Sequence, residues 1–243
     1  QERPKVVTYV GETLQFDMSD EMLAALKKLS TRYSMTPFML LESIFALELY
    51  LYSGTEDICM GVPVQGRRLK GTEHTVGFFA NSVVMRSKFC EARSVQEFLK
   101  SNQEMILAAF KNQDYPFEKM VSKLKFTRHP AYHPVFQYFF QCQPYDFSEE
   151  KKLGNSAFQL DQGKNESSKF EISICAFYDQ SFRKGRTIIE YNTDLFERMQ
   201  IEEFVSSLDS LVQQIAENDT QDIHALQLNC NFKTIDEEED FWN

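Results

Sequence analysis

The stretch Asn112-Gln113-Asp114-Tyr115-Pro116-Phe117-Glu118 is the most informative part of this chain, and it separates two predicted helices. The first helix is expected to end near Lys111, and the second is expected to start at Pro116. Proline suits a first helical position because its missing N–H would have no partner there. Asp114 is predicted to cap the second helix, and Phe117 to anchor it on the core. The residues alone therefore favour a structural role for Asp114, Pro116 and Phe117.

The remaining pattern mixes helices and strands without strict alternation. Ser19 is expected to cap one helix, and Ser94 and Glu97 form a capping box that predicts the start of another. A helix is expected to begin at Pro37 and to end at Ser53-Gly54; it is mostly apolar from Phe38 to Tyr50, so we expect it to be buried. Residues 201–215 carry an apolar stripe at helical spacing. Strands are expected at 13–18, 57–64, 82–89, 135–142, 170–178 and 187–191. The predicted fold class is α+β, an α/β sandwich with one mixed β-sheet and helices packed mainly on one face.

Composition and charge exclude several classes of protein. The 243 residues carry a formal net charge of −10, which disfavours a nucleic-acid partner. No apolar run approaches the length of a membrane span, and no secretory signal is visible, so no membrane partner is expected. Five cysteines without a CxxC pair favour a reducing, cytoplasmic location. His129 and His133 are four residues apart, but the intervening Pro130 forbids a helix that would align them, so no metal site is expected.

The quoted stretch resembles the (H/N)QDYPFE signature of the condensation domains of nonribosomal peptide synthetases. Just upstream, residues 76–86 read VGFFANSVVMR and resemble that family's (I/V)GxFVNTxxxR pattern. Further matches in the same order are Arg3-Pro4, Gly11, 32–54, 57–63, Gly66-Arg67, 128–137 and 190–196. The resemblance thus spans about residues 3 to 217. The departures are Ala80 for Val, Ser82 for Thr and Asn112 for His.

The resemblance implies a two-part architecture, of which this chain has only one part. Condensation domains have two halves, each similar to half of chloramphenicol acetyltransferase, with a substrate tunnel between them. This chain resembles the C-terminal half. The catalytic HHxxxDG motif of the N-terminal half does not occur in the 243 residues, so no catalytic residue is expected on this chain. The implied partners are the N-terminal subdomain, carrier proteins whose phosphopantetheine holds the substrates, and a downstream adenylation domain. No cofactor is expected to bind the chain directly.

Six residues are predicted to face the tunnel or the interface between the halves. Gly77 would let the backbone approach a ligand closely. Asn81 offers a donor and an acceptor to a passing thioester or amide, or else bonds a neighbouring loop. Arg86 forms an ion pair with the other half, or else is an exposed strand arginine. The full set is Gly77, Phe79, Asn81, Ser82, Arg86 and Gln113.

Two alternatives stay open on the sequence alone. The chain could act as a stand-alone interaction or scaffold module, or it could be half of a related epimerisation or ester-forming acyltransferase domain. Residues 1–220 are expected to form the C-terminal condensation subdomain, and 221–243 a flexible linker with an acidic tail. Because the chain begins with Gln1 rather than Met, we expect a piece of a longer product. We also expect an apolar, aromatic-rich patch where the other half would pack.

Overall fold

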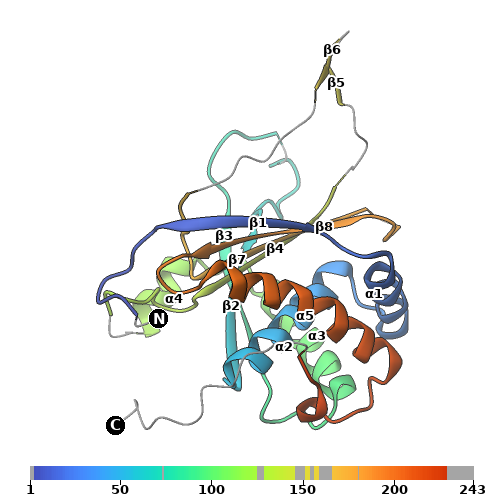
Figure 1. The fold of residues 1–243 in the computed structure, drawn as a ribbon. Coiled ribbons are helices and arrows are strands. Elements are labelled where there is room, and N and C mark those ends of the chain that lie inside the picture. Colours follow the sequence, from blue (N-terminus) through green and yellow to red (C-terminus); the bar gives the residue numbers. More distant parts are fainter. Residues whose placement is uncertain are drawn as a thin grey trace.

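A mixed six-stranded sheet forms the centre of the molecule (Figure 1). The computed structural model describes residues 3–72, 74–124, 129–145, 151–153, 156–158, 166–179 and 181–228. The strands are β1 (Gly11–Asp17), β2 (Asp57–Val64), β3 (Asn81–Lys88), β4 (Tyr138–Pro144), β7 (Ile172–Tyr178) and β8 (Gly185–Asn192). Their order is β1-β8-β7-β4-β2-β3, with β7, β4 and β2 parallel and the other neighbours antiparallel. Strands β5 (Lys151–Leu153) and β6 (Ser156–Phe158) make a separate hairpin.

Helices cover one face of this sheet, as the sequence predicts (Figure 1). They are α1 (Asp20–Tyr33), α2 (Pro37–Ser53), α3 (Val95–Lys111) and α5 (Arg198–Glu217). The short helix α4 (Phe117–Leu124) packs beside β3, and a 3₁₀ turn, η1 (Ile223–Ala225), follows α5. The α+β class with one mixed sheet and helices mainly on one face is therefore confirmed.

Side-chain caps fix where the helices begin. The hydroxyls of Ser19, Thr36 and Ser94 each accept a hydrogen bond from a backbone N–H in the first turn of their helix. Each such cap satisfies a donor that the helix itself cannot pair. The capping box predicted at Ser94 is only half correct, because the Glu97 carboxylate accepts from the N–H of Arg93, one residue earlier, at 3.0 Å.

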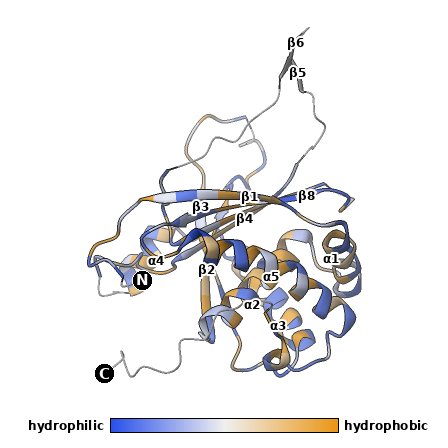
Figure 2. Cartoon of the chain, in the orientation of Figure 1, coloured by the Kyte–Doolittle hydropathy of each residue, from blue (hydrophilic) through white to orange (hydrophobic). Residues whose placement is uncertain are grey.

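The last helix shows how amphipathic elements build the core. Apolar and polar residues alternate around α5 (Figure 2), and its apolar stripe is buried, with α5 packed mainly on α1 and α2. The buried members of that stripe are Ile201, Phe204, Leu208, Leu211, Val212 and Ile215. The predicted three- and four-residue spacing is thus the spacing that packs.

Helix α2 is buried as predicted, but it carries two carboxyl groups into the core. Glu42 accepts a hydrogen bond from the Asn102 amide at 2.8 Å, and Glu48 accepts one from the Ser207 hydroxyl at 2.8 Å. Burial raises the pKa of Glu42 to about 8 and the pKa of Glu48 well above its ordinary value. Burial thus favours the neutral acid over the charged form of both side chains, which avoids placing an unpaired charge in an apolar interior.

Packing continues beyond the boundary expected at residue 220. Ile223 and Leu226 are buried in the core, and Asp222 forms an antiparallel bridge with Ser94. Residues 221–228 therefore lie against the body of the domain, whereas the acidic tail at 229–243 falls outside the described residues. In the described part of the chain, no single helix is long and apolar enough to cross a membrane. The pair α1 and α2, bent by 109°, meets that test only when joined, and α2 is buried.

Candidate functional site

Asn81 ties the start of β3 to the loop that leads into α4. Its side-chain amide donates to the carbonyl oxygens of Gln113 and Tyr115, each at 2.9 Å. Its side-chain oxygen accepts from the N–H of Phe117 at 3.1 Å. Both donors and the acceptor of this side chain are thus engaged within the chain. Of the two roles considered for Asn81, the loop-bonding role is the one that these contacts describe, and contact with a substrate stays a prediction.

The rest of the NQDYPFE stretch closes the end of α3. The side-chain amides of Asn112 and Gln113 donate to the carbonyls of Ala108 and Phe110 in the last turn of the helix. Asp114 does not cap α4 as predicted. Its carboxylate instead pairs with Arg68 at 2.8 Å on the exposed surface, and Asn81 receives the first N–H of α4 in its place.

Phe117 anchors α4, as the sequence indicates. Its ring lies 5.7 Å from the ring of Phe136 and 6.2 Å from that of His133. These rings belong to a cluster that also contains Phe139 and Phe170, stacked on each other at 4.9 Å. The aromatic residues of this region therefore pack on one another, with Phe136 buried and the rings of Phe117, Phe139 and Phe170 half-buried.

Gly61 makes room for this aromatic cluster. A Cβ atom on Gly61 would lie 2.2 Å from the ring of Phe136, which is only 2% exposed and cannot retreat. Burial lowers the pKa of His133, whose ring packs at 4.5 Å from that of Phe136. The histidine is therefore neutral at neutral pH, in keeping with a packing role.

The loop between β2 and β3 holds Gly77 and Phe79. The Arg67 guanidinium lies 4.2 Å above the Phe79 ring and donates to the carbonyls of Thr72 and Thr75. A Cβ on Gly77 would stand 3.1 Å from the same ring, so this glycine permits close packing of Phe79.

Gly66, at the base of the loop, has a positive φ of 64°, and a Cβ there would lie 1.9 Å from the carbonyl oxygen of Phe79. Val76 and Phe78 point outward from this fixed base, 99% and 93% exposed. The loop tip thus exposes two apolar side chains, and the wider aromatic-rich patch expected for an interface stays a prediction.

Ser82 and Arg86 lie on the face of β3 that the helices do not cover. Met85 and Ser87, on the other face, are buried in the core, and side chains alternate along a strand. Arg86 makes a bidentate ion pair with Asp57 of β2, its Nε donating to Oδ1 and its Nη2 to Oδ2, and this pair lowers the pKa of that carboxyl. Arg86 therefore has a partner within its own chain, so a pair with another subdomain is not needed to explain it.

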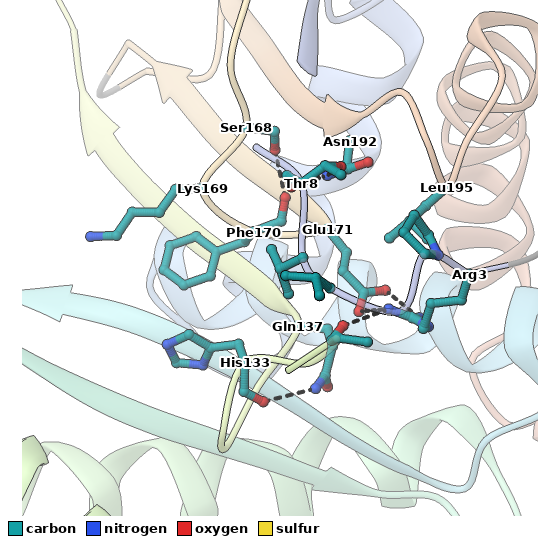
Figure 3. Close-up of a pocket in the computed structure, with 14 residues that line it drawn as sticks. Arg3, Thr8, His133, Gln137, Ser168, Lys169, Phe170, Glu171, Asn192 and Leu195 are labelled. Carbon is teal, nitrogen blue, oxygen red and sulfur yellow. Dashed lines mark hydrogen bonds and ion pairs between the residues drawn. The ribbon is translucent and has the colours of Figure 1, made fainter. Parts of the chain in front are cut away.

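A small pocket lies at the opposite end of the sheet, under the N-terminal segment (Figure 3). Arg3 clamps this segment through a bidentate pair with Glu171, at 2.7 and 3.0 Å, and stacks on Tyr132. The Asn192 amide holds the carbonyl of Thr8 at 2.6 Å. The cavity measures about 30 Å³, enough for one water molecule, and none of the six predicted site residues lines it.

Metal ligation finds no support in the described residues. They contain no group of three or more histidine, cysteine, aspartate or glutamate side chains close enough to hold an ion. The four cysteines that the structure describes are free thiols. The site therefore consists of β3 and the loops beside it, held in one arrangement by the hydrogen bonds of Asn81 and Arg67.

The fold is shared with condensation-type domains of the chloramphenicol acetyltransferase-like class. The X-domain from teicoplanin biosynthesis superposes with a TM-score of 0.81 at 19% identity, covering 94% of this chain and 52% of that one. The first condensation domain of the calcium-dependent antibiotic synthetase gives a TM-score of 0.75 at 13% identity, over 94% of this chain and 50% of that one. The chain thus corresponds to about half of each solved domain.

Sequence comparison places the chain in a family. The model of the Condensation domain matches residues 1–235, and the chain belongs to that family. A linear gramicidin synthase of Brevibacillus parabrevis is 35% identical over 227 residues, which are 93% of this chain and 4% of that protein. Bacitracin synthase 3 of Bacillus licheniformis is 31% identical over 216 residues, 89% of this chain and 3% of that protein. The chain therefore spans a small fraction of these multidomain relatives.

Proposed function

We propose that this chain is the C-terminal half of a condensation domain that forms amide bonds in nonribosomal peptide synthesis. The observation that supports this most directly is the coverage: nearly the whole chain aligns with about half of solved domains of this class. The order of the motifs agrees with it, since the (I/V)GxFVNT-like and NQDYPFE stretches are present and HHxxxDG is absent from the 243 residues.

The reaction joins an amine to a thioester. The amine nitrogen attacks the thioester carbonyl, a C–N bond forms, the C–S bond breaks, and the amine proton passes to a base while the thiol leaves. Holding the two reactants in register supplies much of the rate, and a general base supplies more. In this proposal the chain contributes positioning: Asn81 fixes β3, and the neighbouring Ser82 faces the tunnel on the uncovered side of the sheet.

The partners follow from the same chemistry. Donor and acceptor would arrive on the phosphopantetheine arms of carrier proteins, with an adenylation domain downstream, in a cytoplasmic synthetase. The N-terminal half would supply the histidine base. In this proposal the chain is inactive by itself, because the HHxxxDG motif that would carry the histidine base does not occur in its 243 residues.

Complementation with the N-terminal half tests the proposal. The half bearing HHxxxDG, taken from the same synthetase, is added as a separate chain, and amide product is followed by mass spectrometry with aminoacyl carrier proteins. As the N-terminal half is titrated in, the rate of amide formation should rise and level off near one equivalent of that half per chain. The rate should fall to background when the second histidine of HHxxxDG is changed to alanine. Association without turnover, or no association, would reject the proposal.

A second candidate is an interaction module without catalysis. The fold match to the X-domain favours it, because that domain is also known in a complex with OxyB. The exposed Val76 and Phe78 tip would be the contact surface. This candidate would be supported if the chain bound the N-terminal half without forming amide and if Phe78→Ser abolished that binding.

A further inference from the structure

Strands β2 and β4 separate before either of them ends. They pair at Met60–Tyr138 and Gly61–Phe139, whereas β4 and β7 stay paired from Tyr138 to Pro144. Beyond Gly61, β2 continues to Val64 alongside β3. Over the described residues of both strands, no further β2–β4 pair forms, so the sheet opens at this point.

A cleft of about 450 Å³ occupies the opening. This volume falls within the range of roughly 300–1,000 Å³ that is typical of small-molecule sites. Its walls come from the separating strands, and its floor comes from the start of α2 and the end of α3. The lining residues are Thr36, Phe38, Met39, Val62, Pro63, Phe110, Gln141 and Cys142.

The chemistry of the lining selects for an uncharged ligand. None of the described residues that line the cleft carries a charge. The rings of Phe38 and Phe110 pack at 5.3 Å and make the floor aromatic. Burial raises the pKa of the Cys142 thiol, so it stays a neutral, weakly polar group. Thr36 already uses its hydroxyl to cap α2. Hydrocarbon is therefore the material that this cleft accommodates at least cost.

The cleft lies beside the motif residues of the site. Pro63, in its wall, is the register partner of Ser82, and the next residue, Val64, is the partner of Asn81. Strand β2 lies between β3 and the cleft, so a ligand on the uncovered face at Ser82 would pass over β2 at Pro63 to place a side branch in the cleft.

We propose that this cleft binds the apolar side chain or acyl chain of the thioester-linked substrate. The inference rests on the proposed function, which supplies the thioester-linked substrate. It goes further by giving a chemical class to one part of that substrate: the branch nearest Ser82 is an uncharged hydrocarbon. Carboxylate- or ammonium-bearing side chains are excluded, because the cleft offers no partner for their charge.

Methyl NMR on the chain alone tests the inference. With ¹³C-methyl methionine, hexanoyl-N-acetylcysteamine thioester is titrated in, and the N-acetylcysteamine monothioester of adipic acid, which has the same chain length and a terminal carboxylate, serves as the charged control. The Met39 methyl should shift saturably with the hexanoyl probe and at least tenfold more weakly with the charged one. The exposed Met199 should not shift with either probe.

A pair of variants localises the binding. Cys142→Leu fills the cleft, whereas Cys59→Leu adds the same volume to β2 before the strands part. The first should weaken hexanoyl binding roughly tenfold, since each methylene kept out is worth about a factor of four, and the second less than twofold. If Cys142→Leu fails to fold, the wild-type titrations decide alone.

Three results would overturn the inference: no saturable Met39 shift, equal binding of the two probes, or equal weakening by both variants. None of these measurements needs the N-terminal half. A failed complementation with intact hexanoyl binding would therefore reject the proposed function and leave the cleft assignment standing.

Discussion

Replacing Asn81 by alanine tests whether this residue holds β3 and the α4 loop together. The change removes three hydrogen bonds, two donated to the carbonyls of Gln113 and Tyr115 and one accepted from Phe117. Each such bond contributes about 1 kcal/mol net, and the site is partly exposed, so we expect a loss of about 2–3 kcal/mol of unfolding free energy. Urea denaturation followed by circular dichroism measures the difference directly.

Asn112→Ala is the matched control for this measurement. It removes a single exposed hydrogen bond, to the carbonyl of Ala108, and should cost less than about 1 kcal/mol. A variant at Asn81 that is as stable as the wild type, within about 0.5 kcal/mol, would contradict the structural role. The three hydrogen bonds would then not stabilise the fold, and contact with substrate would become the better explanation for an asparagine at this position.

Three further changes have outcomes that the structure fixes. The raised pKa of Glu42, about 8, means that the native state keeps a proton that the unfolded state releases above its ordinary pKa of 4.5, so wild-type stability falls as pH rises through that window. In wild type this proton lowers the unfolding free energy by about 1.4 kcal/mol per pH unit between pH 6 and 7.5, and Glu42→Gln should remove that contribution. If the unfolding free energies of wild type and variant, measured in urea, changed with pH by the same slope, the prediction would be refuted. Gly61→Ala forces a Cβ against the Phe136 ring and should cost about 1–3 kcal/mol by thermal unfolding, and an unchanged Tm would contradict the clash. Arg68→Ala breaks the exposed pair with Asp114 and should change stability by less than about 1 kcal/mol; a larger loss in urea denaturation would mean that this pair matters more than exposed pairs do.

Local patterns in the sequence are enough to predict the elements of the fold. The Ser19 cap, the apolar run of α2 and the stripe of α5 are each visible within one helix, and each is found as predicted. Strand ends are predicted less accurately, with an error of up to three residues at the start of β4. The pattern cannot fix that boundary, because an apolar strand and the apolar turn before it look alike.

Features that depend on distant partners could not be predicted. Asp114 has the residue type of a helix cap, but Arg68, on another loop, lies within reach and takes its carboxylate. Glu42 and Glu48 interrupt an otherwise apolar helix, a visible signal that the core holds polar partners there. The separation of β2 from β4 has no sequence signature, since it depends on the register between strands that lie far apart along the chain.

The most direct test of the central claim is the rate of amide formation by this chain alone. Purified chain is incubated with an aminoacyl thioester on a carrier protein and an acceptor amine, and the product is compared with that of the same mixture supplemented with the N-terminal half. The account predicts that the chain alone forms amide at the rate of the uncatalysed background. It predicts a rate above that background only in the mixture that contains the N-terminal half. Amide formation well above background by the chain alone would mean that the catalytic group is here, and the account would be wrong.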